Sequence, residues 1–272
     1  MNKQTRLCAL LIAFSVLLCA CGSKEHKAPR RTEVESTERQ FTAPQEGDFI
    51  AIFSTSMGEV RAVLYPDAAP MAVQNFVGLA RLGYYNNTVI WRTEYGFAVQ
   101  GGDAGGTGTG GATIWSNNSY PLEADAGLHH YPGALCAAFA QGGDVTGGSS
   151  QFYFVTALPD SVDKTMQQQM TEQGFSEETA AAYAEAGGLP YLDNTDTVFG
   201  QVYEGMETVD AMACAETQKA EDGTDTFRPE QEITIYRVTI ANYPGPTAEE
   251  SAAWLTPDET DETDQAASDS GQ

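Results

Sequence analysis

One short stretch of the chain combines a fixed cation, a side-chain amide and an aromatic ring. It reads Arg92-Thr-Glu-Tyr-Gly-Phe97-Ala-Val-Gln100-Gly-Gly-Asp103. The guanidinium of Arg92 is always protonated and rigidly planar, so it could form a structural ion pair or donate hydrogen bonds to a bound molecule. Phe97 also fits a core position, and Gln100 could simply satisfy backbone groups. The stretch alone leaves both interpretations open.

Three other patterns suggest chemistry less strongly. The glycine-rich segment 101–111 lacks the Gly-Lys-Ser/Thr ending of a phosphate loop, and it fits better as a loop whose backbone lies close to an extended peptide. His129 and His130 are adjacent and would point to opposite sides of an extended chain. Ser149 and Ser150 lack a histidine partner and a nucleophile-elbow motif. We therefore expect no metal, no cofactor and no hydrolase chemistry.

The first twenty residues are typical of a secretory signal. Lys3 and Arg6 precede an apolar run that is too short for a comfortable membrane span. The run ends in Leu18-Cys19-Ala20-Cys21-Gly22, which resembles the lipobox of bacterial lipoproteins. This resemblance implies cleavage before Cys21, lipidation of its thiol, and a lipid-anchored protein on the extracytoplasmic face of a bacterial cell membrane. An ordinary signal peptide or a short membrane anchor is the alternative.

The 272 residues carry a formal net charge of −24. Such an acidic chain is a poor partner for nucleic acid, which is bound through clustered cations. The composition predicts a flexible polar tether at residues 21–47, a folded domain at 48–243 and an acidic disordered tail at 244–272, which contains Trp254.

The folded domain contains two cysteines, Cys136 and Cys214. They fit two unpaired buried thiols or one disulfide.

The domain contains many short apolar runs separated by glycine-rich loops, which indicates a β-barrel or sandwich. The first two runs flank Ser54-Thr-Ser-Met-Gly58 and predict a hairpin. Helices are expected after Pro70, from Gly205 to Met212, and at Asp163–Gln173 and Ser176–Ala186. The last two helices form an insertion at about 158–190.

Four blocks, in order, resemble the cyclophilin family. They are Ala69-Pro70 with Gln74-Asn75-Phe76, Arg92–Asp103, Gly148-Ser-Ser-Gln151-Phe-Tyr-Phe154, and Val198-Phe-Gly200-Gln-Val-Tyr-Glu-Gly205-Met. The resemblance runs from about Phe49 to Ile240 and implies a mainly β fold. This fold is an eight-stranded antiparallel barrel capped by two helices, here with the helical insertion added. The implied activity is peptidyl-prolyl cis/trans isomerisation of X–Pro bonds, without a cofactor, in proline-containing polypeptides. Together with the secretory signal, the resemblance implies that the protein assists the folding of exported proteins.

The resemblance also implies the roles of individual residues. Arg92 aligns with the arginine that donates to the prolyl nitrogen while the amide is twisted, and Gln100 aligns with the glutamine that orients it. The implied substrate-binding residues are Phe97, Ala138, Phe139, Tyr153, Tyr191 and Leu192.

Several aligned positions depart from the family pattern. Tyr153 replaces a phenylalanine at the pocket base, Phe139 an asparagine whose backbone holds the peptide, and Asp196 a histidine at the pocket edge. Tyr191 replaces the tryptophan associated with cyclosporin binding, which argues against sensitivity to that drug.

Two other functions compete with the isomerase hypothesis. The second hypothesis is a catalytically weak module that binds proline-bearing chains or acts as a chaperone. A structural or adhesive role for the insertion is the third. The insertion could overhang the groove or decorate the outside.

Overall fold

The barrel begins with the expected hairpin. A computed structural model describes residues 26–115, 119–140 and 147–246 of the chain. Strands β1 (Phe49–Thr55) and β2 (Gly58–Leu64) pair antiparallel, with Phe53 opposite Val60. Gly58 at the turn has a φ of +138°, a conformation that L side chains rarely adopt.

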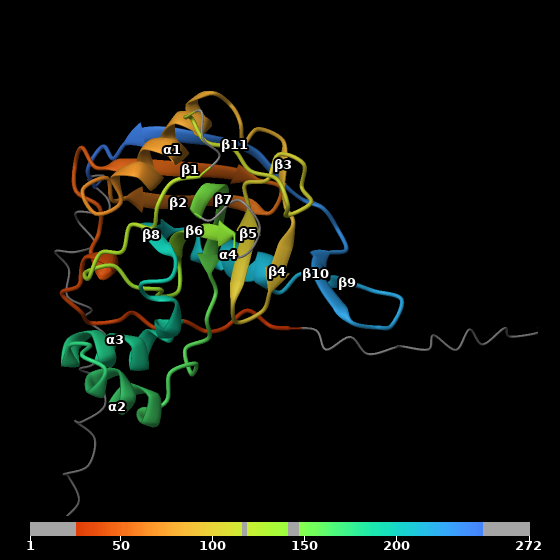
Figure 1. Cartoon of the computed structure of the whole chain (residues 1–272). Helices are drawn as coiled ribbons and strands as arrows, with labels where there is room; N and C mark the ends of the chain where they lie inside the picture. Colours follow the sequence, from red (N-terminus) through yellow and green to blue (C-terminus); the bar gives the residue numbers. More distant parts are fainter. Residues whose placement is uncertain (1–25, 116–118, 141–146, 247–272) are drawn as a thin grey trace, which may run out of the picture.

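Nine strands form the main sheet, in the order β3-β11-β1-β2-β8-β6-β7-β5-β4 (Figure 1). Strands β3 and β4 are separated by Trp91 alone, whose N–H donates to the Gln100 carbonyl at 3.0 Å. Because β3 pairs with β11 and β4 pairs with β5, counting β3 and β4 as one bent strand closes an eight-stranded antiparallel barrel. This confirms the predicted fold class. The remaining strands are β3 (Thr88–Ile90), β4 (Arg92–Glu94), β5 (Ala98–Gly101), β6 (Ala134–Ala140), β7 (Gly147–Val155), β8 (Thr197–Glu204) and β11 (Ile233–Asn242).

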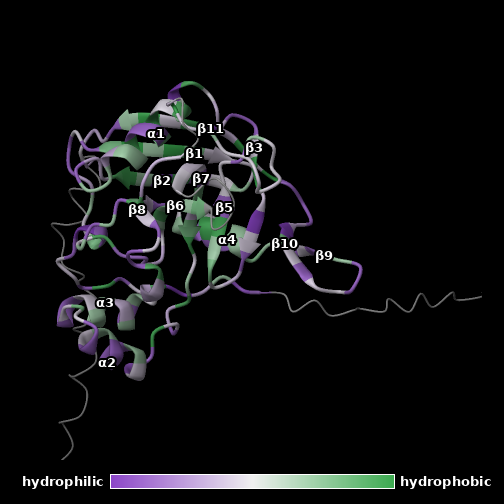
Figure 2. Cartoon of the chain, in the orientation of Figure 1, coloured by the Kyte–Doolittle hydropathy of each residue, from purple (hydrophilic) through white to green (hydrophobic). Residues whose placement is uncertain are grey.

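Helices α1 (Pro70–Arg81) and α4 (Met206–Ala213) bury their apolar faces in the barrel core. Pro70 begins α1, where its missing N–H costs no helical hydrogen bond. The ring of Phe76 reaches the rings of Phe53 and Phe152 at 5.8 Å each. Figure 2 shows the central strands as the most hydrophobic part of the molecule, as expected for a closed barrel whose interior is filled by side chains.

The insertion forms two helices, as the sequence predicted, and a short 3-10 turn follows them. These are α2 (Lys164–Glu172), α3 (Glu177–Ala186) and η2 (Pro190–Leu192). Ser176 caps α3 by accepting the Thr179 N–H at 2.9 Å. The two helices form a separate apolar cluster around Tyr131, Met170 and Tyr183.

The described part of the expected tether lies against the domain, which corrects the expectation of a free, flexible segment there. Residues 26–47 include the turn η1 (Arg39–Phe41). Arg31 makes a two-point ion pair with Asp210 of α4, at 2.7 Å from each carboxylate oxygen, and donates to the Ala157 carbonyl at 3.0 Å. Gln40 is buried between the His129 carbonyl and Gln201. Sequence patterns missed this segment because its few anchoring side chains have no period.

A second small sheet was not expected. It pairs β9 (Thr217–Lys219) with β10 (Asp225–Pro229), and β10 packs against β4.

The two cysteines of the domain do not form a disulfide. Cys136 and Cys214 are both free thiols, the first buried and the second partly exposed. Within the described residues, no helix is long and apolar enough to cross a membrane. The signal, Cys21 and Trp254 lie outside the described residues.

Replacing Arg31 should loosen the N-terminal segment. The side chain of Asp210 is 5% exposed, so Arg31→Ala leaves a buried carboxylate without its cation. We expect the free energy of unfolding to fall by about 1–3 kcal/mol, since the pair is partly solvated at Arg31. Urea denaturation measures this change, with the exposed neighbour Arg30→Ala as the matched control. Equal stability of both variants and the wild type would contradict the assignment.

Candidate active site

Strand pairing places the two residues of the predicted catalytic pair side by side. Arg92 on β4 lies opposite Gln100 on β5, and its Nη1 donates to Gln100 Oε1 at 3.3 Å. Its Nη2 donates to Glu94, two residues along the same strand. The guanidinium carbon lies 5.0 Å from the centre of the Phe97 ring. The cation therefore has two acceptors and an aromatic ring that hold its plane.

A glycine-rich loop supports Gln100 from behind through Gln151. Gln100 Nε2 donates to Gln151 Oε1 at 3.1 Å, and Gln151 donates to the carbonyls of Gly108 and Gly110. The loop wraps around the carboxylate of Asp103, which is 2% exposed. That carboxylate accepts backbone N–H groups from residues 105, 107, 108 and 110.

The environment of Asp103 explains why this loop is no phosphate cradle. Burial would raise the pKa of Asp103, but the backbone N–H groups of the loop outweigh it and hold the pKa below its usual value. The N–H groups that a phosphate would need are thus already occupied. Gly110 is required here because a Cβ would lie 2.1 Å from Asp103 Oδ1.

Next to Arg92 lies an apolar surface outside the barrel interior. Phe97, Ala138, Tyr153 and Leu192 all join one cluster with Cys136 and Val198. Four of the predicted substrate-binding residues are therefore brought together. An apolar cluster with partly exposed side chains beside a fixed cation can hold a proline ring with its amide near the guanidinium.

Two departures from the family pattern contact each other. The Tyr153 hydroxyl donates to Asp196 Oδ2 at 2.8 Å. Tyr153 is 5% exposed, and its burial, together with the nearby Cys136 and Asp196, raises the pKa of the phenol. Burial also raises the pKa of Asp196, although the Tyr153 hydrogen bond opposes that shift. The hydroxyl that tyrosine adds at the pocket base is thus satisfied by the carboxylate that replaces histidine at the edge.

Two predicted residues lie apart from the apolar cluster. The side chain of Phe139 packs against the barrel core, with its ring 6.4 Å from the Tyr120 ring, so its side chain is not a wall of the pocket. The cause is the alternation of a strand: Ala138 faces the pocket, and its neighbour faces the other side. Tyr191 is 62% exposed; its partial burial, and then the charge of the nearby Glu94, raise the pKa of its phenol.

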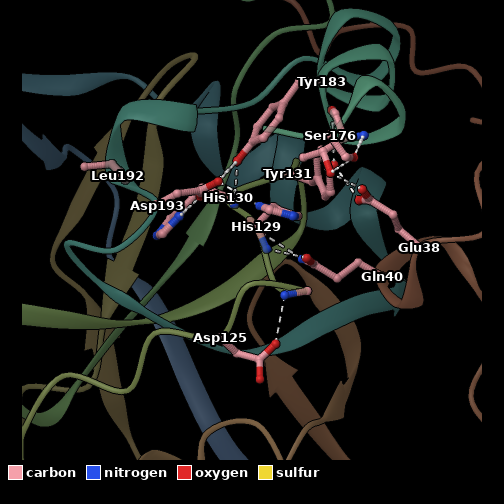
Figure 3. A network of polar contacts seen from close by, with 12 residues as sticks. Glu38, Gln40, Asp125, His129, His130, Tyr131, Ser176, Tyr183, Leu192 and Asp193 are labelled. Carbon is pink, nitrogen blue, oxygen red and sulfur yellow. Dashed lines mark hydrogen bonds and ion pairs between the residues drawn. The ribbon is translucent and has the colours of Figure 1, made fainter. Parts of the chain in front are cut away.

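His129 and His130 share one carboxylate, rather than pointing to opposite sides as an extended chain would require. Neither residue belongs to a strand, and both Nδ1 atoms reach Asp193, at 2.8 and 2.7 Å (Figure 3). The Tyr183 hydroxyl from α3 lies 2.9 Å from the same carboxylate. Burial would raise the pKa of Asp193, but the hydrogen bonds from the two histidines lower it overall. Among the described residues, no group of three or more ligand-type side chains could hold a metal ion.

A comparison with protein families matches residues 50–240 to the cyclophilin type peptidyl-prolyl cis-trans isomerases. The chain belongs to the cyclophilin family. Its activity is therefore the cis/trans isomerisation of peptidyl-prolyl bonds, as the sequence blocks implied.

Bacterial relatives support this family assignment. A protein of Staphylococcus saprophyticus that is named for the same isomerase activity is 35% identical over 189 residues, covering 70% of this cyclophilin and 90% of the relative. A Streptococcus pyogenes protein, named for a phosphatase and an isomerase activity together, is 37% identical over 188 residues, which is 68% of this chain but 37% of that protein.

Solved cyclophilin structures from Cryptosporidium parvum share the fold. One crystal structure has a TM-score of 0.56 and 24% identity, covering 73% of this cyclophilin and 99% of that chain. Another, obtained in the presence of the dipeptide Ala-Pro, has a TM-score of 0.54 and 26% identity, covering 71% and 99%.

Sequence reasoning missed three residues around Arg92. Gln151 carried a detectable signal: it lies two residues before Tyr153, so in a strand both side chains face the same side. Glu94 carried the same signal relative to Arg92. Phe227 carried none, because its ring reaches the guanidinium of this cyclophilin, at 5.9 Å, from a hairpin more than a hundred residues away in the chain.

The Asp193 network predicts a loss of stability in acid. A carboxyl group whose pKa is lowered by folding stabilises the protein above its unfolded pKa, and this stabilisation is lost as the pH falls through the folded pKa. Below about pH 4, the wild type should therefore lose unfolding free energy faster than Asp193→Asn. At neutral pH, the variant should be about 1–3 kcal/mol less stable.

Urea denaturation at several pH values measures this difference. The control is Asp125→Asn, which removes an exposed carboxylate from the nearby loop. Parallel stability–pH curves for the wild type and Asp193→Asn would contradict the prediction.

Proposed function

We propose that Arg92 is the catalytic residue of this isomerase and that Gln100 orients it. The observation that carries this proposal is the guanidinium of Arg92, held by Gln100 and Glu94 beside the apolar cluster of Phe97, Tyr153 and Leu192. Ala138 completes the pocket floor and Tyr191 its rim, while Phe139 contributes through its backbone.

The chemistry needs only a site that prefers the twisted amide. Rotation about an X–Pro bond has a barrier of roughly 20 kcal/mol because the nitrogen lone pair is delocalised into the carbonyl. In the twisted state the lone pair returns to nitrogen, where a donor from Arg92 stabilises it. Because the guanidinium is already oriented by its acceptors, little reorganisation is needed when the amide twists.

We further propose that the enzyme is a lipoprotein of a bacterial cell, anchored through Cys21 on the extracytoplasmic face of the membrane. There it would act on proline-containing polypeptides as they fold after export. The support is the lipobox-like sequence Leu18-Cys19-Ala20-Cys21-Gly22 after an apolar run. A domain with a formal charge of −18 over residues 48–243 would remain soluble beside the membrane and would not bind strongly to anionic lipid.

Removing the cation should abolish most of the catalysis. For Arg92→Ala we expect kcat/KM on a proline tetrapeptide to fall about 100-fold, the scale of losing one preorganised donor. Arg92→Lys should recover little of the rate, because an ammonium lacks the planar fork. A protease-coupled isomerisation assay measures both variants.

The exposed Arg237→Ala, on β11, is the matched control for the loss of one positive charge. Equal rates for the wild type and Arg92→Ala, both at the uncatalysed level, would contradict the catalytic proposal. Peptide binding without faster exchange between cis and trans forms would then favour the hypothesis of a binding module.

Lipidation can be tested separately from catalysis. When the full chain is expressed in a bacterium, we expect labelled palmitate to be incorporated and the protein to sediment with membranes. Cys21→Ala should lose the label, whereas Cys19→Ala should keep it, because only the cysteine after the cleavage point is modified. An unlabelled, soluble wild-type protein would contradict the anchor.

A further inference from the structure

An aromatic residue near Arg92 has a backbone conformation that is unusual for its type. Within the described residues, three non-glycine residues have a positive φ: Asn87 at 58°, Asn194 at 66° and Phe227 at 56°. Asparagine tolerates the left-handed region, but a bulky aromatic side chain rarely occurs there. The conformation of Phe227 is therefore strained and has to be imposed by its surroundings.

The hairpin β9–β10 imposes it through several hydrogen bonds. The pairing register shifts between Asp225 and Pro229, which marks an irregularity in β10. Asp225 Oδ1 accepts the Phe227 N–H at 2.7 Å, and the Thr226 hydroxyl donates to the Gln218 carbonyl at 2.8 Å. The guanidinium of Arg228 donates to the Gly106 carbonyl at 2.8 Å, which attaches the hairpin to the glycine-rich loop. Such irregularities redirect a side chain.

The redirected ring lies at the proposed catalytic cation. The guanidinium carbon of Arg92 is 5.9 Å from the Phe227 ring centre, within the range of a cation–π contact. Gln100, Glu94 and Phe97 belong to the β4–β5 hairpin that also carries Arg92. Phe227 alone among these neighbours comes from a distant segment, so it limits the motion of the guanidinium relative to the rest of the domain.

We propose that Phe227 is a positioning residue that limits the orientations open to the Arg92 guanidinium, and that the strained backbone of β10 exists to place its ring there. This inference rests on the proposed catalytic role of Arg92. A long, flexible arginine side chain loses much of its conformational entropy when it is fixed. In this protein the folded hairpin already restricts the side chain, so little of this entropy is lost when substrate binds.

The variant Phe227→Asn separates positioning from stability. Asparagine accepts the positive φ but carries no ring, so the midpoint temperature of unfolding should not fall. The kcat should fall about tenfold with KM nearly unchanged, because the apolar pocket that binds proline is untouched. Phe227→Tyr should restore most of the kcat. A merely structural role would lower stability and activity together, and that result would overturn the proposal.

Two further measurements complete the test. In an Arg92→Ala background, Phe227→Asn should cause no additional loss of kcat. The NMR signal of the Arg92 Nε–H should shift in Phe227→Asn, because a nearby ring is lost, but not in the control Tyr236→Asn, which removes an exposed aromatic from β11.

A wild-type kcat together with an unmoved Arg92 signal in Phe227→Asn would overturn the inference. If Arg92→Ala were fully active, the proposed catalytic role would fail instead. The NMR shift would still decide whether Phe227 positions the guanidinium.

Discussion

The buried carboxylate of Asp103 is the interaction on which the geometry around Arg92 depends. It collects the backbone N–H groups of the glycine-rich loop, and the loop then presents its carbonyls to Gln151. Gln151 holds Gln100, and Gln100 holds Arg92. Each amide uses one of its atoms for the previous bond and another for the next. The orientation of the Arg92 guanidinium therefore depends on the buried Asp103 carboxylate. The guanidinium also pairs with Glu94, so its plane is fixed on one side by this chain of amide bonds and on the other by a carboxylate of its own strand.

The pocket floor shows how one substitution can depend on another. Tyrosine at position 153 buries a hydroxyl, which would be costly without a partner. Asp196 supplies that partner and is itself buried enough for its pKa to be raised. The two departures from the family pattern therefore form one hydrogen-bonded pair, and an apolar floor is retained beside Arg92. Neither residue can be interpreted correctly without the other.

The insertion and the N-terminal segment stabilise the loop that carries Leu192. Asp193, next to Leu192, binds both histidines and the hydroxyl of Tyr183 on α3 (Figure 3). Glu38 of the N-terminal segment binds Tyr131 and Thr179. The insertion is thus connected to the segment that carries Leu192 through polar side chains, and Phe41 of the N-terminal segment packs against the same cluster. These contacts hold Asp193, next to Leu192, against α3.

Sequence alone predicted the helices and the strands of the main sheet, because alternation and helical spacing are local signals. These patterns fitted a barrel or a sandwich, and the closed barrel was implied by the matched blocks occurring in family order. The β9–β10 sheet was not predicted. The aligned blocks also singled out Arg92, Gln100, Phe97 and Tyr153, and strand pairing places Arg92 opposite Gln100. Only the tertiary structure decided that Phe139 faces the core, that residues 26–47 lie against the domain, and that Phe227 reaches Arg92. Each of these depends on which side chains meet when distant segments are brought together by barrel closure. The periodicity of the sequence does not predict contacts between such distant side chains, because these contacts depend on the packing and hydrogen bonding of the whole fold.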